Sequence, residues 1–320
     1  MNDFGVRKVV VTGAAGMLGT ALIDSLAERH EVIATDIRPG LQSAAVRWSI
    51  FDLCDDGALR KFLTAEQPDL VVHTAALVDV DLCERDPFAA ERLHVHVTEV
   101  ISSTVTAWDG AMIYVSTDSV FDGRKDGPYR EDDQPAPTNT YARTKLQGEA
   151  ACLALARGTV LRTNIFGWSR AGRLSFAEWV LRVLAEHSAQ GMFNDVRFTP
   201  IHVAHLSQTI EQVWQGGVNG LYHAAGATSL TKYDFAVLVA SVFGFSTDRI
   251  TSVSVDDADL TANRPKNMAL LSTKLESALE TKLPPAVEGV RLMKRQYDDG
   301  WVARIKQGAM APGYRFWEVP

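Results

Sequence analysis

Tyr141 and Lys145 form a YxxxK pattern in a segment that we expect to be helical. Four-residue spacing places both side chains on one face of a helix. A phenol has an ordinary pKa near ~10, but a neighbouring ammonium stabilises the phenolate and so eases proton exchange. The pair therefore predicts a tyrosine that gives a proton to a carbonyl, or takes one from an alcohol. The same spacing also occurs in solvated helix pairs, so the surrounding residues must decide.

Thr117 ends the apolar segment AMIYVST, which we expect to be a buried strand. In a parallel sheet, the carboxyl end of a strand is where ligands bind. The hydroxyl of Thr117 can then donate a hydrogen bond to the carbonyl oxygen of a substrate. Thr117, Tyr141 and Lys145 are therefore the predicted catalytic set.

Gly13, Gly16 and Gly19 follow the first predicted strand with GxxGxxG spacing. Small residues there allow the backbone to approach a pyrophosphate at the N-terminus of the next helix. Asp36 ends the second predicted strand, where its carboxylate can accept hydrogen bonds from an adenosine ribose, which favours NAD. Arg38 could instead meet a 2′-phosphate, so NADP stays open.

The elements that must position these residues alternate between β-branched and amphipathic segments, as in βαβ units. We expect strands at 9–12, 32–35, 70–73, 112–115 and 159–166, and helices at 17–29, 55–65, 87–107 and 140–157. Gly, Pro and Asp are frequent in 118–139, which predicts a long surface loop. The predicted fold is α/β, a Rossmann-type doubly wound parallel sheet with a smaller mixed α/β substrate lobe. We assign 1–165, with about 200–225 returning to it, to dinucleotide binding and 166–320 mainly to the substrate lobe.

Composition excludes several classes of partner. The chain has 320 residues and a formal net charge of -7, so a general attraction to nucleic acid or to anionic membranes is not expected. Its three cysteines, Cys54, Cys83 and Cys152, are far apart and form neither a disulfide framework nor a CxxC motif. No signal peptide or membrane-spanning segment is recognisable, and we expect a cytoplasmic protein.

Four histidines invite a metal interpretation that we do not favour. His94 and His96 are two residues apart and would diverge on a helix, and His202 and His205 lack an evident third ligand. We predict no metal.

Nine segments occur in order between residue 9 and about residue 275: TGAAGMLG, VVHTAALVDVDLCERDP, STDSVFDG, PYREDDQPAP, YARTKLQGE, LRTNIFG, FTPIHVAHLSQTI, GLYHAAG and RPKNMALLSTKL. In these segments the chain resembles the extended short-chain dehydrogenase/reductases and, within them, the dTDP-4-dehydrorhamnose reductases. The resemblance implies that the predicted catalytic set is indeed catalytic and that the cofactor is NAD, or NADP. The implied cofactor contacts are Gly13, Ala15, Gly16, Met17, Leu18, Asp36, Ile37, Asp52, Leu53, Ala75, Ala76, Tyr141 and Lys145.

The resemblance also implies a substrate, a 4-keto deoxy sugar carried on a nucleotide. Asn164 would face the nicotinamide and the substrate, and Arg264 would meet a nucleotide diphosphate. Phe121 and Trp168 could stack on a sugar or base, although aromatic side chains more often serve a core. A homodimer stays open as an assembly.

Three positions depart from the family pattern. His94 stands where the extended families usually carry asparagine, so a proton relay through that position would be altered or absent. Ser119 stands where the reductases usually have an aromatic residue, and His205 where acidic residues are common. A changed pocket or substrate is therefore expected.

Two other functions stay open. An epimerase or dehydratase would reduce its bound cofactor only transiently, but dehydratases commonly have TDE or SDE where this chain has TDS. A non-catalytic regulatory subunit is the second alternative, because the methionine adenosyltransferase beta subunit resembles the same branch. Such a subunit would be indicated by damage to the catalytic set, and Thr117, Tyr141 and Lys145 are all present.

Overall fold

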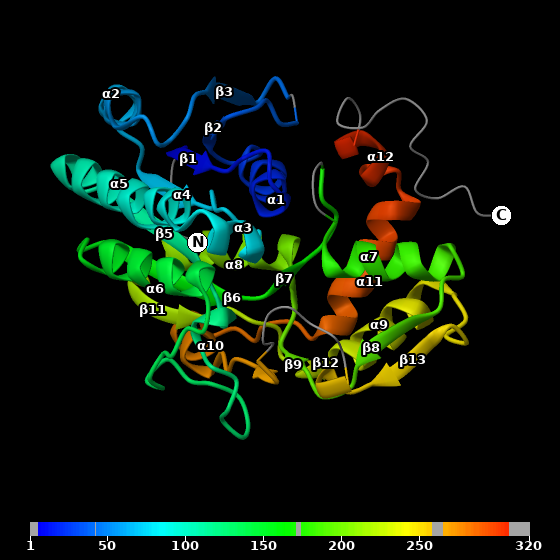
Figure 1. Cartoon of the computed structure of the whole chain (residues 1–320). Coiled ribbons are helices and arrows are strands. Elements are labelled where there is room, and N and C mark those ends of the chain that lie inside the picture. Colours follow the sequence, from blue (N-terminus) through cyan, green and yellow to red (C-terminus); the bar gives the residue numbers. More distant parts are fainter. Residues whose placement is uncertain (1–5, 42, 171–173, 258–264, 307–320) are drawn as a thin grey trace.

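A seven-stranded parallel sheet forms the centre of the computed structural model, which describes residues 6–41, 43–170, 174–257 and 265–306 (Figure 1). The strands lie in the order β11-β6-β5-β4-β1-β2-β3, and every neighbouring pair is parallel. Their bounds are β1 (Lys8–Thr12), β2 (Glu31–Asp36), β3 (Val46–Ile50), β4 (Leu70–His73), β5 (Ala111–Thr117), β6 (Gly158–Thr163) and β11 (Gly220–His223). The predicted Rossmann-type doubly wound sheet is confirmed.

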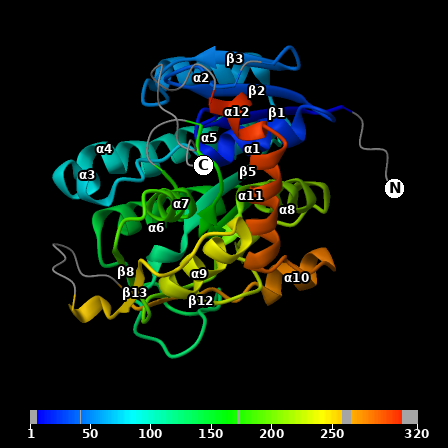
Figure 2. The same cartoon turned by 90° about the vertical axis from the view of Figure 1, so that its right-hand side faces the viewer.

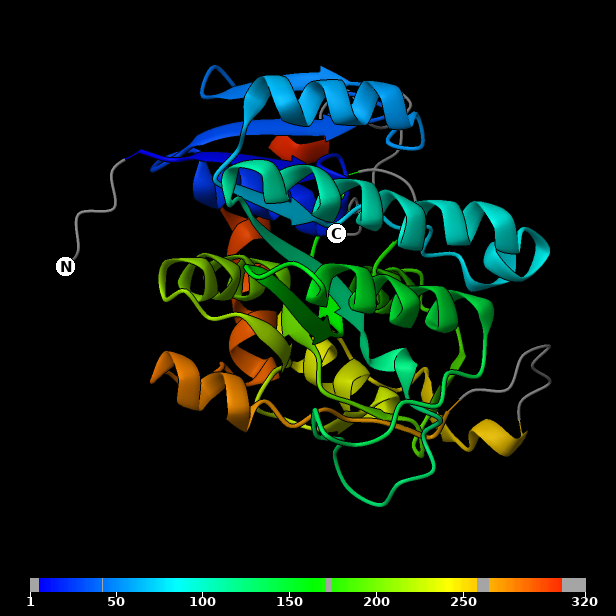
Figure 3. The same cartoon turned by 90° about the vertical axis from the view of Figure 1, so that its left-hand side faces the viewer.

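Helices cover both faces of this sheet, which is why its central strands are apolar on both sides. Val9 and Val11 on β1 pack in one cluster with α1 and α8, and Val10 packs in another with α2, α5 and α6. Figure 3 looks onto the second layer, where α2, α5 and α6 lie side by side in blue to green. These helices are α1 (Met17–Leu26), α2 (Asp56–Glu66), α5 (Val97–Val105), α6 (Thr140–Leu153) and α8 (Val203–Gln215).

Local capping explains where the two helices nearest the predicted site begin. Asn139 accepts a hydrogen bond from the N–H of Ala142 and starts α6, so Tyr141 lies in its first turn. Asp55 caps α2 in the same way. By contrast, α1 begins at Gly16 without a side-chain cap, which leaves its first N–H groups for another partner.

Several predicted boundaries differ from the structure. The strand expected over 159–166 is divided at Asn164 into β6 and the short β7 (Ile165–Phe166), and β3 was not expected. The helix expected over 87–107 consists of α4 (Pro87–Glu91), a π-helical turn (Arg92–His96), α5 and a final 3₁₀ turn (Thr106–Trp108). The apolar periodicity runs through the π-helical turn, so the pattern alone does not reveal the extra residue in it.

The remaining elements are smaller, and most of them build a second core around Phe166, Phe198 and Phe235. They pair in three small sheets, β10-β7, β12-β9-β14 and β13-β8. Their bounds are α3 (Val80–Arg85), α7 (Phe176–Ala185), β8 (Gln190–Phe193), β9 (Arg197–Phe198), β10 (Ile201–His202), β12 (Leu230–Thr231), α9 (Lys232–Phe243), β13 (Ile250–Val253), β14 (Asn267–Met268), α10 (Thr273–Leu279), α11 (Ala286–Asp298) and α12 (Trp301–Lys306).

The last two helices return from this second core to the first. Figure 2 shows α11 and α12, in orange to red, rising toward α1. The indole N–H of Trp301 donates to the carboxylate of Asp24 on α1, at 3.2 Å. The ammonium of Lys306 pairs with Glu178 on α7 at 2.8 Å, so one short helix ties the two cores together.

Within the ranges given above, no helix is both long and apolar enough to cross a membrane. The described part of the chain also has no group of three or more His, Cys, Asp or Glu side chains that could hold a metal ion.

Candidate active site

The glycine turn between β1 and α1 is closed tightly on itself and on the segment after β4. Gly13 has a φ of +64°, and a Cβ there would lie 2.6 Å from the backbone nitrogen of Ala75. A Cβ on Gly19 would lie 2.4 Å from the carbonyl oxygen of Gly13. Glycine is therefore required at both positions, and the uncapped start of α1 at Gly16 is left facing outward. This arrangement fits a pyrophosphate, which the predicted cofactor would supply.

Asp36 lies beside this turn, at the carboxyl end of β2. Its Oδ2 accepts a hydrogen bond from the N–H of Ala15 at 3.1 Å, so the carboxylate and the glycine turn are held together. Ile37 follows and is 71% exposed, which leaves an apolar surface next to the carboxylate. Asp52 and the buried Leu53 follow the adjacent strand β3. These four residues share one edge of the sheet, as an adenosine site requires.

The predicted catalytic residues lie at the carboxyl end of β5, which β4 separates from β1, and at the start of α6. Thr117 is the last residue of β5, and Tyr141 is in the first turn of α6. The side chain of Lys145 is 2% exposed, and its ammonium donates to the carbonyl oxygen of Val115 at 2.7 Å. The same ammonium lies 3.9 Å from the ring centroid of Tyr114, a cation–π contact. The side chain of Lys145 thus links α6, on which it lies, to β5.

Burial shifts the proton affinities of both side chains. It raises the pKa of Tyr141 to about 12, against the effect of a hydrogen bond with Thr117. It lowers the pKa of Lys145 to about 7, against the attraction of the Glu149 carboxylate. At neutral pH the phenol therefore keeps its proton, while the ammonium is close to its own titration.

Asp118 is a site residue that the sequence prediction missed. Its carboxyl group is 2% exposed and accepts a hydrogen bond from the amide of Asn164 at 2.5 Å. The hydroxyl groups of Thr117 and Ser119 both donate to its other oxygen at 3.3 Å. Burial raises the pKa of Asp118, and the amide of Asn164 opposes that shift. The predicted substrate residue Asn164 is therefore held by this carboxyl group, which also orients the hydroxyl of Thr117.

A buried ion pair supports the same helix. Glu149 lies one turn after Lys145 and accepts hydrogen bonds from the guanidinium of Arg162 at 2.9 and 2.7 Å. The hydroxyl of Ser116 donates to the same carboxylate at 2.5 Å. Glu149 lies four residues after Lys145 and therefore on the same helix face, which is a signal that the sequence offers. Nothing in the sequence identifies Arg162 as its partner.

The two side chains that could stack on a ligand, Trp168 and Phe121, are both buried. Trp168 is 1% exposed, and its indole N–H donates to the carbonyl oxygen of Met293 at 2.9 Å. Phe121 is fully buried and stacks on Tyr129 with ring centroids 4.1 Å apart. Both rings therefore serve the protein core in this structure, and their stacking on a sugar or base stays a prediction. Arg264 lies outside the described residues.

The two histidines of the first pair point to different partners, whereas the rings of His202 and His205 are in contact, with centroids 5.9 Å apart. His94 is buried against α6, whereas His96 forms a 2.7 Å contact with Asp56 on α2. His202 is buried, and its Nδ1 accepts the N–H of Ala204 at 3.2 Å. His205 is half-buried, and burial lowers its pKa.

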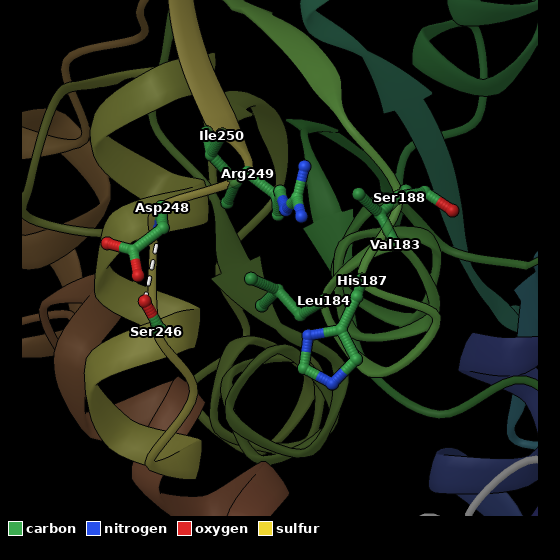
Figure 4. Close-up of a pocket in the computed structure, with 8 residues that line it drawn as sticks. All are labelled: Val183, Leu184, His187, Ser188, Ser246, Asp248, Arg249 and Ile250. Atoms are coloured by element: carbon green, nitrogen blue, oxygen red, sulfur yellow. Dashed lines mark hydrogen bonds between the residues drawn. The ribbon is translucent and has the colours of Figure 1, made fainter.

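A small pocket of about 180 Å³ lies away from these residues, between the end of α7 and the start of β13 (Figure 4). His187 and Arg249 point toward it, and the N–H of Asp248 donates to the hydroxyl of Ser246 at 3.2 Å. None of its lining residues belongs to the predicted site, so this pocket is separate from the candidate active site.

A protein-family model described as the RmlD substrate binding domain matches residues 7–298. Three curated relatives cover most of the chain. A probable low-salt glycan biosynthesis reductase of Haloferax volcanii is 28% identical and covers 90% of this chain and 98% of its own. The methionine adenosyltransferase 2 subunit beta of Pongo abelii is 31% identical, covering 85% and 82%. A dTDP-4-dehydrorhamnose reductase of Mycolicibacterium smegmatis is 29% identical, covering 88% and 83%.

Among solved structures, the fold is similar to a dTDP-4-dehydrorhamnose reductase from Bacillus anthracis in complex with NADP. The TM-score is 0.82 at 23% identity, and the match covers 91% of this chain and 99% of that one. A likeness at this identity supports the fold.

Proposed function

The chain belongs to the RmlD substrate binding domain family, and from that membership we propose that it reduces a 4-keto deoxy sugar carried on a nucleotide. The expected enzyme class, an oxidoreductase, agrees with the reductase relatives of this family. The solved structure of the Bacillus anthracis reductase in complex with NADP supports a nicotinamide dinucleotide as the cofactor. The sugar nucleotide and the role of Tyr141 as general acid belong to the proposal.

The meeting of Thr117, Tyr141 and Lys145 at the carboxyl end of β5, on the same edge of the sheet as the uncapped start of α1, carries the proposal. The bound cofactor supplies a hydride. When substrate binds, the hydroxyl of Thr117 turns from Asp118 to the carbonyl oxygen, which the phenol of Tyr141 also binds. The phenol passes its proton to that oxygen as charge develops there. The ammonium of Lys145 stabilises the resulting phenolate.

The choice between NADH and NADPH stays within the proposal. Asp36 favours a free ribose, but two arginines lie nearby. Burial lowers the pKa of the Arg170 guanidinium, and the charge of the neighbouring Arg38 adds to that effect. Arg170 reaches this region by donating to the carbonyl oxygen of Pro39 at 3.2 Å. Two guanidinium groups near one ribose would favour a 2′-phosphate. Comparing dissociation constants for both cofactors in Asp36→Ala and Arg38→Met will decide.

We also keep the predicted division of labour as a proposal. Residues 1–165, with 200–225, would bind the cofactor, and the rest of 166–320 would mainly bind the sugar nucleotide. This division is supported by α8, which packs in the first core, and by β11, which pairs with β6 in the large sheet.

The test is oxidation of NADH and NADPH against a panel of nucleotide-linked 4-keto-6-deoxy sugars. Tyr141→Phe should lower kcat by roughly 10²- to 10⁴-fold while cofactor binding is retained, because only the proton donor is removed. Tyr233→Phe on α9 is the matched control and should behave as the wild type. Wild-type protein that binds the cofactor but turns over none of the panel would contradict the proposed function.

A regulatory subunit is the second candidate, because a methionine adenosyltransferase 2 subunit beta is 31% identical. The intact catalytic set argues against it, and cofactor binding without turnover would support it. A dehydratase is less favoured, because Ser119, which donates to Asp118, stands where dehydratases commonly have a second carboxylate.

A further inference from the structure

The π-helical turn between α4 and α5 places a histidine ring deep beneath the catalytic helix. A π-helical turn widens the helix and takes carbonyl groups out of the regular hydrogen-bond ladder, and such turns are frequent at functional sites. Here the carbonyl oxygen of His94 accepts the hydroxyl of Thr98 at 2.7 Å and that of Tyr114 at 3.3 Å. The side chain of His94 is completely buried.

Both ring nitrogens of His94 have defined partners. The backbone N–H of Leu77 donates to Nε2 at 2.9 Å, so Nε2 must be the unprotonated nitrogen. Nδ1 lies 2.8 Å from the hydroxyl oxygen of Thr144. That hydroxyl gives its own proton to the carbonyl oxygen of Thr140 or Tyr141, at 2.9 and 3.0 Å, and therefore accepts from Nδ1. These contacts assign the neutral tautomer with the proton on Nδ1.

The two partners of this ring belong to the two halves of the candidate active site. Leu77 directly follows Ala75 and Ala76, the segment that closes on the glycine turn. Thr144 directly precedes Lys145 on α6. The edge of the imidazole also meets the ring of Tyr141, with centroids 5.7 Å apart and planes at 84°. One side chain thus spans from the cofactor segment to the proton donor.

We propose that His94 is a positioning residue that fixes the cofactor segment relative to Tyr141 and Lys145. The proposal rests on the proposed function. Burial and the nearby Lys145 and His73 lower the pKa of His94 to about 2, so the ring stays neutral during turnover. It therefore works through geometry and donates no proton to the substrate.

Two substitutions separate the two contacts. In His94→Asn, the short amide still reaches Thr144 from the position of Nδ1 but no longer reaches Leu77. In His94→Gln, the longer amide accepts from Leu77 at the position of Nε2 and loses Thr144. The matched control is His96→Asn in the same turn, because His96 faces Asp56 instead.

The readouts are the dissociation constants of NADH and NADPH, measured without substrate, and kcat at saturation. We expect His94→Asn to weaken cofactor binding about tenfold, the loss of one hydrogen bond to a backbone N–H. His94→Gln should keep that constant within about threefold and lower kcat, and His96→Asn should change neither. Both His94 variants binding and turning over as the wild type, with only a lower Tm, would overturn the inference. Wild-type protein that binds neither dinucleotide would instead overturn the proposed function on which it rests.

Discussion

Lys145→Met should remove a pH dependence from the stability of the cofactor-free protein. The pKa of this lysine falls from its ordinary 10.5 to about 7 in the folded state. Between those values the unfolded chain binds more protons than the folded chain, so wild-type stability rises with pH across that window. Methionine carries no proton and removes this contribution while nearly preserving the side-chain volume.

The magnitude follows from the size of the shift. At 1.36 kcal/mol per pKa unit, the full window corresponds to about 5 kcal/mol. About half of it, on the order of 2–3 kcal/mol, falls between pH 6 and pH 9, where urea unfolding is practical. The difference in free energy of unfolding, wild type minus variant, should therefore increase by that amount as the pH rises from 6 to 9.

The assay is urea unfolding of both proteins at pH 6, 7, 8 and 9 without cofactor. Lys61→Met on α2 is the control, because Lys61 is exposed and its replacement should give a difference that does not vary with pH. A difference in free energy of unfolding between wild type and Lys145→Met that also does not vary with pH would refute the reasoning. It would mean that the ammonium is solvated in the folded protein, in spite of its burial.

Three further predictions concern stability and binding. Gly13→Ala should weaken binding of NADH and NADPH, measured by titration, because its φ is +64° and its Cβ would meet the backbone of Ala75. Glu149→Gln should lower the free energy of unfolding by about 3–5 kcal/mol, since it leaves the buried guanidinium of Arg162 unpaired, and a loss below 1 kcal/mol would contradict the pairing. Trp168→Phe should cost about 1 kcal/mol in urea unfolding for its lost indole hydrogen bond. Its KM should not change, because the ring does not reach the substrate.

The parts of the site that the sequence predicted are those fixed by local geometry. The glycine turn follows from the spacing of three glycines within a few residues. The shared face of Tyr141 and Lys145 follows from the helical repeat alone. Asp36 was placed because it is an acidic residue at the end of the second predicted strand, where a carboxylate can meet an adenosine ribose. Each of these inferences needs no knowledge of distant packing.

The parts that were missed or wrong depend on contacts between remote segments. Trp168 was predicted to be a ligand contact because aromatic rings can stack on a sugar or base, yet its indole N–H donates to Met293 on α11, 125 residues later. Asp118 was overlooked because the residue after a strand can point either way, and Asn164 determines which. The role of His94 depends on a π-helical turn that leaves no mark in the hydrophobic pattern.

The position of β11 has a consequence for how the chain is made. β6 pairs with β5 on one side and with β11 on the other, and β11 begins 57 residues after β6 ends. At 5–20 residues per second, a ribosome leaves the outer edge of β6 without its partner for roughly 3–11 s. An open edge of this kind recruits strands from other chains. The nascent protein therefore passes through an interval in which β6, a fully buried strand of the finished sheet, is its open edge. The interval ends when Gly220–His223 emerges and the less buried β11 takes the edge position, and a fragment that stops near residue 165 would keep β6 open.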